Sequence, residues 1–207
     1  MTNQTTVTIL YAVAAMGLIC ATAKGNYQIT VDGSKHDIKL GKEIVVNSKN
    51  GDAVHIKIEK KKIAAFQSEF VSFNHKNNMT VSSTDTDDGF RQIMAITGLG
   101  TIILVQEHSK LNPEKILDLC LQGLVKDQLE QGFRMTKKKY SKELSDGTKL
   151  KGYKATLKRG KETKICIVLV KGKRHRGVVV ATSIDQDKIR GDRDVLELFW
   201  KTLKIKL

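Results

Sequence analysis

The chain has 207 residues, of which 40% are hydrophobic and 5% aromatic, with 16 glycines and a single proline. This length and apolar content are enough for a buried core, and they exclude fibrous, collagen-like and disordered proteins. The 36 Lys and Arg residues outnumber the 22 Asp and Glu residues, so the formal net charge is +14 and anionic partners are favoured. Because the lysines are spread along the whole chain, a solubilising lysine-rich surface explains the charge as simply as a dedicated anion-binding face does.

The N-terminal segment is uncharged and apolar. The first 23 residues contain no Asp, Glu, Lys or Arg, and an apolar run extends from Val7 to Cys20. A run of this length matches the hydrophobic region of a secretory signal peptide and is short for a membrane-spanning helix. We therefore expect residues 1–23 to be a signal peptide cleaved before Lys24, with the mature protein secreted or periplasmic. A lipoprotein anchored through Cys20 and an uncleaved membrane anchor are the alternatives.

The next segment is predicted to be rich in β-strands. Apolar and polar residues alternate from residue 25 to residue 62, and Asp32-Gly33 and Asn50-Gly51 interrupt the alternation. Period-two alternation bounded by such dipeptides is typical of short antiparallel strands joined by tight turns. We expect residues 24–62 to form an N-terminal β-strand extension.

The remaining chain is predicted to alternate groups of strands with two helices. The first helix is expected to begin with Asn112 as N-cap and Pro113 at its first position, and to end at Gly132. A second helix is expected over residues 192–203. The expected strands cover residues 66–73, 79–83, 90–96, 101–106, 133–144, 148–157, 163–170 and 177–182. This order predicts an α+β protein in which two helices cover an antiparallel β-sheet.

The same order of elements resembles the PsbP-like fold, an α/β/α sandwich found in lumenal photosystem proteins and in many exported bacterial proteins of unknown role. The resemblance covers about residues 66–207. It rests on Glu69-Phe70-Val71-Ser72-Phe73, on residues 100–106, on Asn112-Pro113, on the hairpin at residues 147–153, and on residues 198–203. It implies a binding or accessory protein, because the fold carries no shared catalytic residues.

Two cysteines, Cys120 and Cys166, follow the predicted leader. Each lies in an apolar stretch, where a free cysteine behaves as a small hydrophobic residue. An oxidising compartment would also permit the two to form a disulfide. The sequence leaves both possibilities open.

The sequence contains no local signature of a common active site. A nucleophile elbow, a zinc-protease motif, a Cys-x-x-Cys pair, a phosphate-binding loop and a dinucleotide-binding glycine motif are all absent. The acidic turn at residues 85–89 lacks the later glutamate of a calcium loop. The five histidines are scattered singly: His36, His55, His75, His108 and His175. We therefore expect no catalytic residue, no metal and no cofactor, and a hydrolase assembled from distant residues is the alternative from another class.

Two basic clusters follow the first predicted helix. One is Lys137-Lys138-Lys139, and the other contains Lys171, Lys173, Arg174 and Arg176. If the folded chain brings them together, they could form one positive face that attracts phosphates in a salt-dependent way, whereas a merely solvated face is the alternative.

These observations predict an exported, non-enzymatic binding or accessory protein. Its expected partner is an unidentified protein or an anionic component of the cell envelope, and peripheral contact with a membrane is compatible with the charge. The alternative is a protein that binds anionic lipid or envelope polyanions through its basic face. Only Tyr140 and Tyr153 lie near the basic clusters to stack on bases, so we expect no specific nucleic-acid partner.

Overall fold

The computed structural model describes residues 26–59, 61–86 and 89–207. The predicted signal peptide, its cleavage point and Cys20 lie outside these residues. Within the described part of the chain, no helix has both the length and the hydrophobicity needed to cross a membrane. The chain divides between Lys62 and Ile63 into two compact units, which we call the N-terminal unit and the C-terminal unit.

The N-terminal unit consists of two antiparallel hairpins, as the alternating pattern predicts. The first joins β1 (Asn26–Val31) to β2 (Ser34–Lys39), and the second joins β3 (Glu43–Asn47) to β4 (Ala53–Lys57). Among the described residues of this unit, the side chains of Ile38 and Val46 are buried. The predicted β-rich extension is therefore confirmed.

The C-terminal unit is built around a seven-stranded antiparallel sheet. Its strands lie in the spatial order β10-β11-β12-β13-β9-β8-β7. Their bounds are β7 Thr80–Asp85, β8 Phe90–Ile96, β9 Ile102–His108, β10 Arg134–Glu143, β11 Lys149–Arg159, β12 Glu162–Lys173 and β13 Arg176–Asp185.

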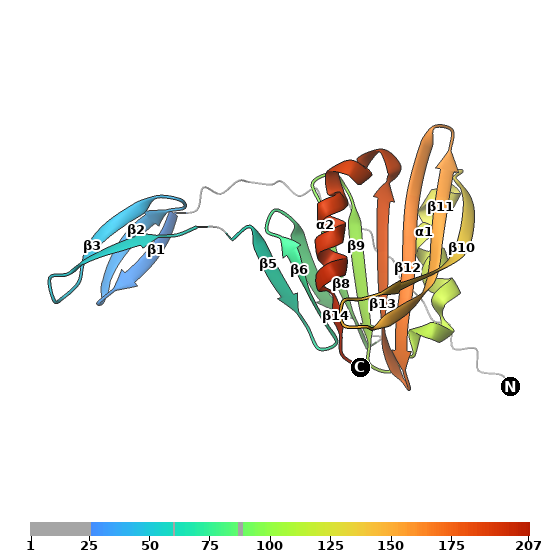
Figure 1. Ribbon diagram of the computed structural model, residues 1–207, viewed down its shortest axis with the longest axis horizontal. Coiled ribbons are helices and arrows are strands. Elements are labelled where there is room, and N and C mark those ends of the chain that lie inside the picture. The colour runs from blue at the N-terminus through green and yellow to red at the C-terminus, as the bar shows by residue number, and fades with distance from the viewer. Residues whose placement is uncertain (1–25, 60, 87–88) are drawn as a thin grey trace. The chain divides into compact units, whose positions relative to one another are not determined.

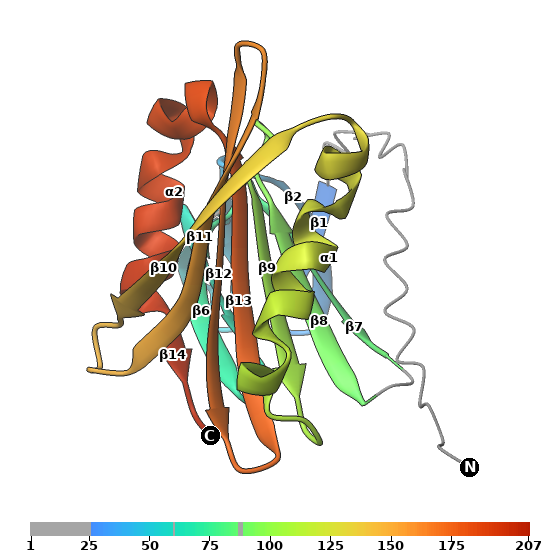
Figure 2. The same ribbon diagram turned by 90° about the vertical axis from the view of Figure 1, so that its right-hand side faces the viewer.

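The two helices lie on opposite sides of this sheet (Figures 1 and 2). Helix α1 (Leu117–Glu130), preceded by the 3-10 turn η1 (Pro113–Lys115), packs on β11 and β12. Helix α2 (Ile189–Thr202) follows the 3-10 turn η2 (Gln186–Lys188) on the other side. A three-stranded sheet of β14 (Lys204–Ile205), β6 (Val71–Lys76) and β5 (Ile63–Gln67) lies beside α2. The predicted α+β class, with two helices covering an antiparallel sheet, is confirmed.

Alternate residues of the sheet pack against the two helices. On β12, Cys166, Val168 and Val170 join the apolar cluster of α1, whereas Leu169 joins the cluster of α2. Successive side chains of a strand point to opposite faces, so this strand is buried on both sides. The unbroken apolar run at residues 165–170 follows from that double burial.

The prediction of a single strand over residues 66–73 is wrong, because the chain turns between β5 and β6. The buried carboxylate of Glu107 on β9 holds this turn with one oxygen, Oε1. That oxygen accepts hydrogen bonds from Ser68 Oγ at 2.5 Å, Phe70 N at 2.8 Å and Val71 N at 2.9 Å. The polar run at residues 67–69 interrupts the alternation and is the local sequence signal of this turn.

The helix boundaries differ from the prediction by a few residues. Asn112 does act as a cap, since its Oδ1 accepts the N–H of Glu114 at 3.0 Å, but it caps η1 and α1 begins at Leu117. Helix α2 begins at Ile189, one turn earlier than expected. Its first turn is fixed by Asp192, a buried residue whose Oδ2 accepts a 2.6 Å hydrogen bond from Thr97 Oγ1.

Candidate anion-binding site at the turn between β12 and β13

The turn that joins β12 to β13 carries four consecutive basic or imidazole side chains. Lys173 pairs with Arg176 across the hairpin, which leaves Arg174 and His175 as the two residues of the turn. Arg174 has a φ of 57°, in the left-handed region that glycine adopts without strain. A side chain in this region costs about 1–2 kcal/mol, so a bulky residue here is a reason to look for a function.

The two glycines below the turn allow η1 to pack directly on the hairpin. A Cβ atom at Gly172 would lie 1.8 Å from Asn112 Oδ1, and one at Gly177 would lie 2.4 Å from Pro113 Cδ. The carboxylate of Glu114 adds to this contact by accepting the N–H of Gly172 at 3.0 Å. The part of the hairpin next to the turn is therefore held tightly against η1.

A recess of about 410 Å³ lies at this end of the sheet and is lined by Ser109 and by residues 173–176. The Arg176 guanidinium lies over the Phe70 ring at 5.7 Å, and Lys173 Nζ donates to the main-chain oxygen of Leu207 at 3.3 Å. Among the described residues, no side-chain carboxylate forms an ion pair with Lys171, Lys173, Arg174 or Arg176. Their charge is available to an anion from outside the molecule.

The other predicted basic cluster does not join this site. Lys137 lies level with Cys166 on β12, five residues from Lys171, which corresponds to about 17 Å along the strand. Alternation also places Lys138 on the α2 side of the sheet and its two lysine neighbours on the α1 side. Strand register therefore separates Lys137 from the turn, and alternation places Lys137 and Lys139 on the opposite side of the sheet from Lys171 and Lys173.

Lys137 is also engaged within the protein. Its Nζ donates to Asp118 Oδ1 at 2.7 Å and lies 4.5 Å from the centre of the Tyr153 ring. The hydrogen bond to Asp118, more than any other cause, raises the pKa of Lys137 above its ordinary value. This lysine serves the packing of α1 against the sheet edge.

The two cysteines are free thiols buried in the apolar cluster between α1 and the sheet. Burial raises the pKa of Cys120 to about 11, and burial also raises the pKa of Cys166. The structure therefore shows the buried-thiol alternative rather than a disulfide.

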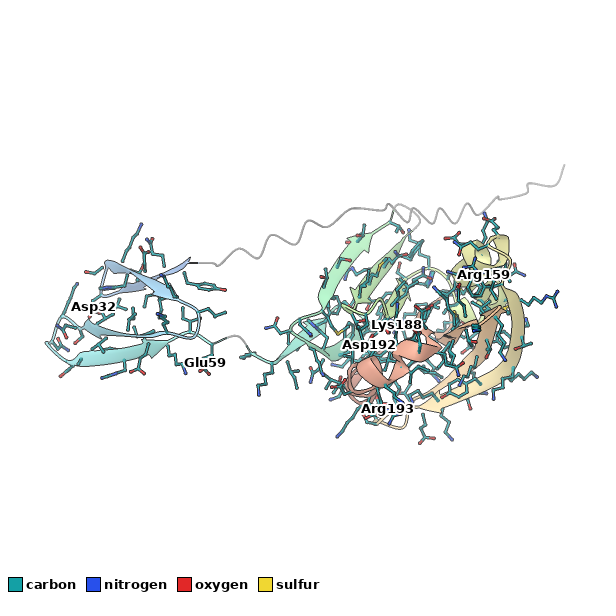
Figure 3. All side chains as sticks on the ribbon, turned by 90° about the horizontal axis from the view of Figure 1, so that it is seen from above. Asp32, Glu59, Arg159, Lys188, Asp192 and Arg193 are labelled. Carbon is teal, nitrogen blue, oxygen red and sulfur yellow. The ribbon has the colours of Figure 1, made fainter. Side chains whose placement is uncertain are left out.

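A larger groove, of about 770 Å³, lies at the opposite end of the sheet, between the turn joining β11 to β12 and the start of η2. Asp185 accepts hydrogen bonds there from Lys188 at 2.9 Å and pairs with Lys164 at 3.4 Å. The hydrogen bond from Lys188 is the main cause that lowers the pKa of Asp185, which makes this carboxylate a weak base. Figure 3 labels Lys188 and also Arg159, which lines the same groove.

This groove was not predicted from the sequence, since its lysines and carboxylates come from two separate segments, residues 161–164 and 185–188. A charge pattern along one segment could not reveal it. Elsewhere, the acidic turn contains Asp85, which pairs with Arg91 at 2.7 Å, whereas Asp87 and Asp88 lie outside the described residues. No group of three or more potential metal ligands occurs in the part of the chain that the structure describes.

The comparison with solved structures returns a protein of similar overall arrangement. The chain is similar to the solution structure of cyanobacterial PsbP (CyanoP) from Synechocystis sp. PCC 6803, with 8% sequence identity and a TM-score of 0.47. The match covers 70% of this chain and 93% of that chain. No family model matches the sequence, and no curated protein matches it. This comparison assigns no role to any residue of the chain.

Proposed function

We propose that this chain is an exported, non-enzymatic accessory protein that binds an anionic component of the cell envelope through the turn between β12 and β13. The observation that carries the proposal is the concentration of cations at residues 173–176 around one recess, none of which forms a described ion pair with a side-chain carboxylate. An anionic lipid headgroup or an envelope polyanion has the complementary charge.

A hydrolase, the rival from another class, needs a nucleophile beside a base. The groove around Asp185 is the described recess with the most titratable groups. Its described lining contains one hydroxyl, that of Thr163, and contains no histidine or cysteine. The carboxylate of Asp185 is already engaged by two lysines, so its arrangement suits an ion-pair network better than proton transfer.

Vesicle co-sedimentation tests the proposal. The wild-type protein and the variant Lys173→Gln/Arg174→Gln/Arg176→Gln would be compared on phosphatidylcholine vesicles with and without phosphatidylglycerol. A basic residue near an anionic surface contributes about 1 kcal/mol, so three substitutions should weaken binding on the order of a hundredfold at low salt.

A matched control removes the same charge at three exposed lysines away from the turn, Lys139, Lys161 and Lys201. We expect this triple glutamine variant to keep most of the affinity. If both triple variants lose affinity equally, net charge alone explains the binding and the turn is not the site.

A further inference from the structure

The register of β10 and β11 sets like charges directly opposite one another. Arg134 pairs with Lys158, Lys138 pairs with Lys154, and Thr136 pairs with Thr156 between them. All six side chains belong to the side of the sheet that faces α2, because Tyr140 and Leu150, which are even-numbered like them, pack in the apolar cluster of α2. We call these three pairs the cationic ladder.

Nothing on the neighbouring strand neutralises the ladder. The β12 residues level with it on the same side are Thr163, Ile165 and Ile167, none of which carries a charge. The described ion pairs include none with the four ladder cations, whereas Lys149, on the same β11 strand, pairs with Glu143 at 3.6 Å. Like charges opposite one another destabilise a sheet, so an anion bound between these cations would reduce their repulsion and stabilise the folded protein.

A recess of about 490 Å³ opens over two of the three ladder pairs, Arg134 with Lys158 and Thr136 with Thr156. It is lined by Gly132, Arg134, Thr136, Thr156, Lys158, Arg159 and Gly160. Gly132 and Gly160 lie at the same end of the β10–β11 pair, and a Cβ atom at either would meet no atom within 4 Å, so the recess is open at that end. No carboxylate lines the recess.

Arg159 shares this lining but is held by other groups. Its guanidinium donates to the main-chain oxygen of Gln131 at 3.0 Å and to Glu162 at 2.9 Å, and it lies 4.5 Å from the centre of the Phe133 ring. The cations left for a ligand are therefore Arg134 and Lys158, with the hydroxyl groups of Thr136 and Thr156 beside them.

We propose that this recess binds a phosphate group. A guanidinium presents paired N–H donors that match two phosphate oxygens, and an ammonium supplies a further charge. The two threonine hydroxyls can donate to the remaining oxygens. The phosphate belongs either to the headgroup of a phospholipid or to a soluble phosphorylated compound. This site is separate from the turn between β12 and β13, and its binding does not require that turn.

The test compares two double variants that remove the same charge from the same two strands. Arg134→Gln/Lys158→Gln removes the ladder cations that line the recess. Lys139→Gln/Lys151→Gln removes two exposed lysines of β10 and β11 on the opposite side of the sheet. Binding of inorganic phosphate would be followed by the NMR shifts of the backbone amides, and binding to phosphatidylcholine vesicles with and without phosphatidic acid by co-sedimentation.

We expect saturable shifts centred on Thr136 and Thr156 in the wild-type protein. The ladder variant should lose phosphate affinity about tenfold or more, since each charge-assisted hydrogen bond is worth about 1.5–3 kcal/mol, and the control should change less than about twofold. Parallel loss of binding to phosphatidic acid vesicles would identify a lipid headgroup. Phosphate binding without any preference for these vesicles would identify a soluble ligand.

Folding is checked by thermal unfolding without phosphate. The ladder variant should melt at or above the wild-type temperature because it has lost a repulsive pair. Phosphate should raise the melting temperature of the wild type and of the control double variant, and should leave that of the ladder variant unchanged. Equal loss of phosphate affinity in both double variants, or shifts centred away from the ladder, would overturn the proposal. The triple variant of the β12–β13 turn should still bind phosphate, which separates this site from the proposed envelope contact.

Discussion

Replacing Arg174 with glycine should make the protein more stable and its anion binding weaker. Arg174 occupies the left-handed region with a φ of 57°, where a side chain costs about 1–2 kcal/mol. Glycine removes that cost but adds about 0.5–1 kcal/mol of backbone entropy lost on folding. The expected net gain in the free energy of unfolding is about 0.5–1 kcal/mol. The same substitution removes one of the cations that surround the recess.

Urea unfolding followed by Trp200 fluorescence measures the stability change. Trp200 is the single tryptophan of the chain and lies on α2, so its signal reports on the C-terminal unit. The gain should appear as a higher midpoint at an unchanged slope. Co-sedimentation with phosphatidylglycerol vesicles should show a loss of about 1 kcal/mol in binding, or roughly fivefold.

Arg174→Gln is the matched control, because it removes the charge and keeps a β-carbon in the strained conformation. It should bind as weakly as Arg174→Gly and remain as stable as the wild type. If Arg174→Gly is less stable than wild type, the backbone strain assigned to this turn does not exist. If it binds vesicles as tightly as wild type, the turn does not contribute its charge to binding.

Three further outcomes are expected from buried groups of the C-terminal unit. Glu107→Ala should lower the free energy of unfolding by about 2–4 kcal/mol in the same urea experiment, because it leaves the buried N–H groups of Phe70 and Val71 without an acceptor. A loss below about 1 kcal/mol would show that the turn between β5 and β6 does not depend on this carboxylate. Burial lowers the pKa of His108 below its ordinary value of 6.5, so the unfolded chain takes up a proton before the folded chain does. The free energy of unfolding should therefore fall as the pH drops from about 6.5 towards the lower pKa of the folded state, and it should fall less in His108→Gln between about pH 7 and about pH 5. If the wild type and the variant lose equal stability over this range, the burial of His108 is not the cause. Cys120 and Cys166 are buried and the pKa values of their thiols are raised, so a thiol reagent should react slowly with the native protein. After unfolding, the same reagent should react with both thiols. If protein from an oxidising host shows no thiol after unfolding, it contains the disulfide instead.

The sequence predicted the local features of this protein well, because each depends on residues close together in the chain. Tight turns at Asp32-Gly33 and Asn50-Gly51 separate the strands of the N-terminal unit, as the alternation indicated. The Asn112 cap was found at its predicted position, although it caps a 3-10 turn. The basic turn at residues 171–176 was also visible in the sequence, since its charges are consecutive and a hairpin keeps them together.

Features that depend on pairing between distant segments were missed or wrong. The opposition of Arg134 and Lys158 exists only because β10 and β11 pair in one register, and a shift of one residue would move every side chain to the other face. The break between β5 and β6 depends on Glu107, a residue far along the chain whose carboxylate replaces the lost strand pairing.

The sequence by itself thus determined most of the strand and helix segments and where positive charge is concentrated along the chain. Backbone geometry imposes periods of two and 3.6 residues on any segment with one buried face, and these periods can be read locally. Only the tertiary structure decided which charges share a face, which thiols share a core and which cations stand opposite one another. Those outcomes follow from strand order and register, which are set by burying the apolar residues of the whole unit at once.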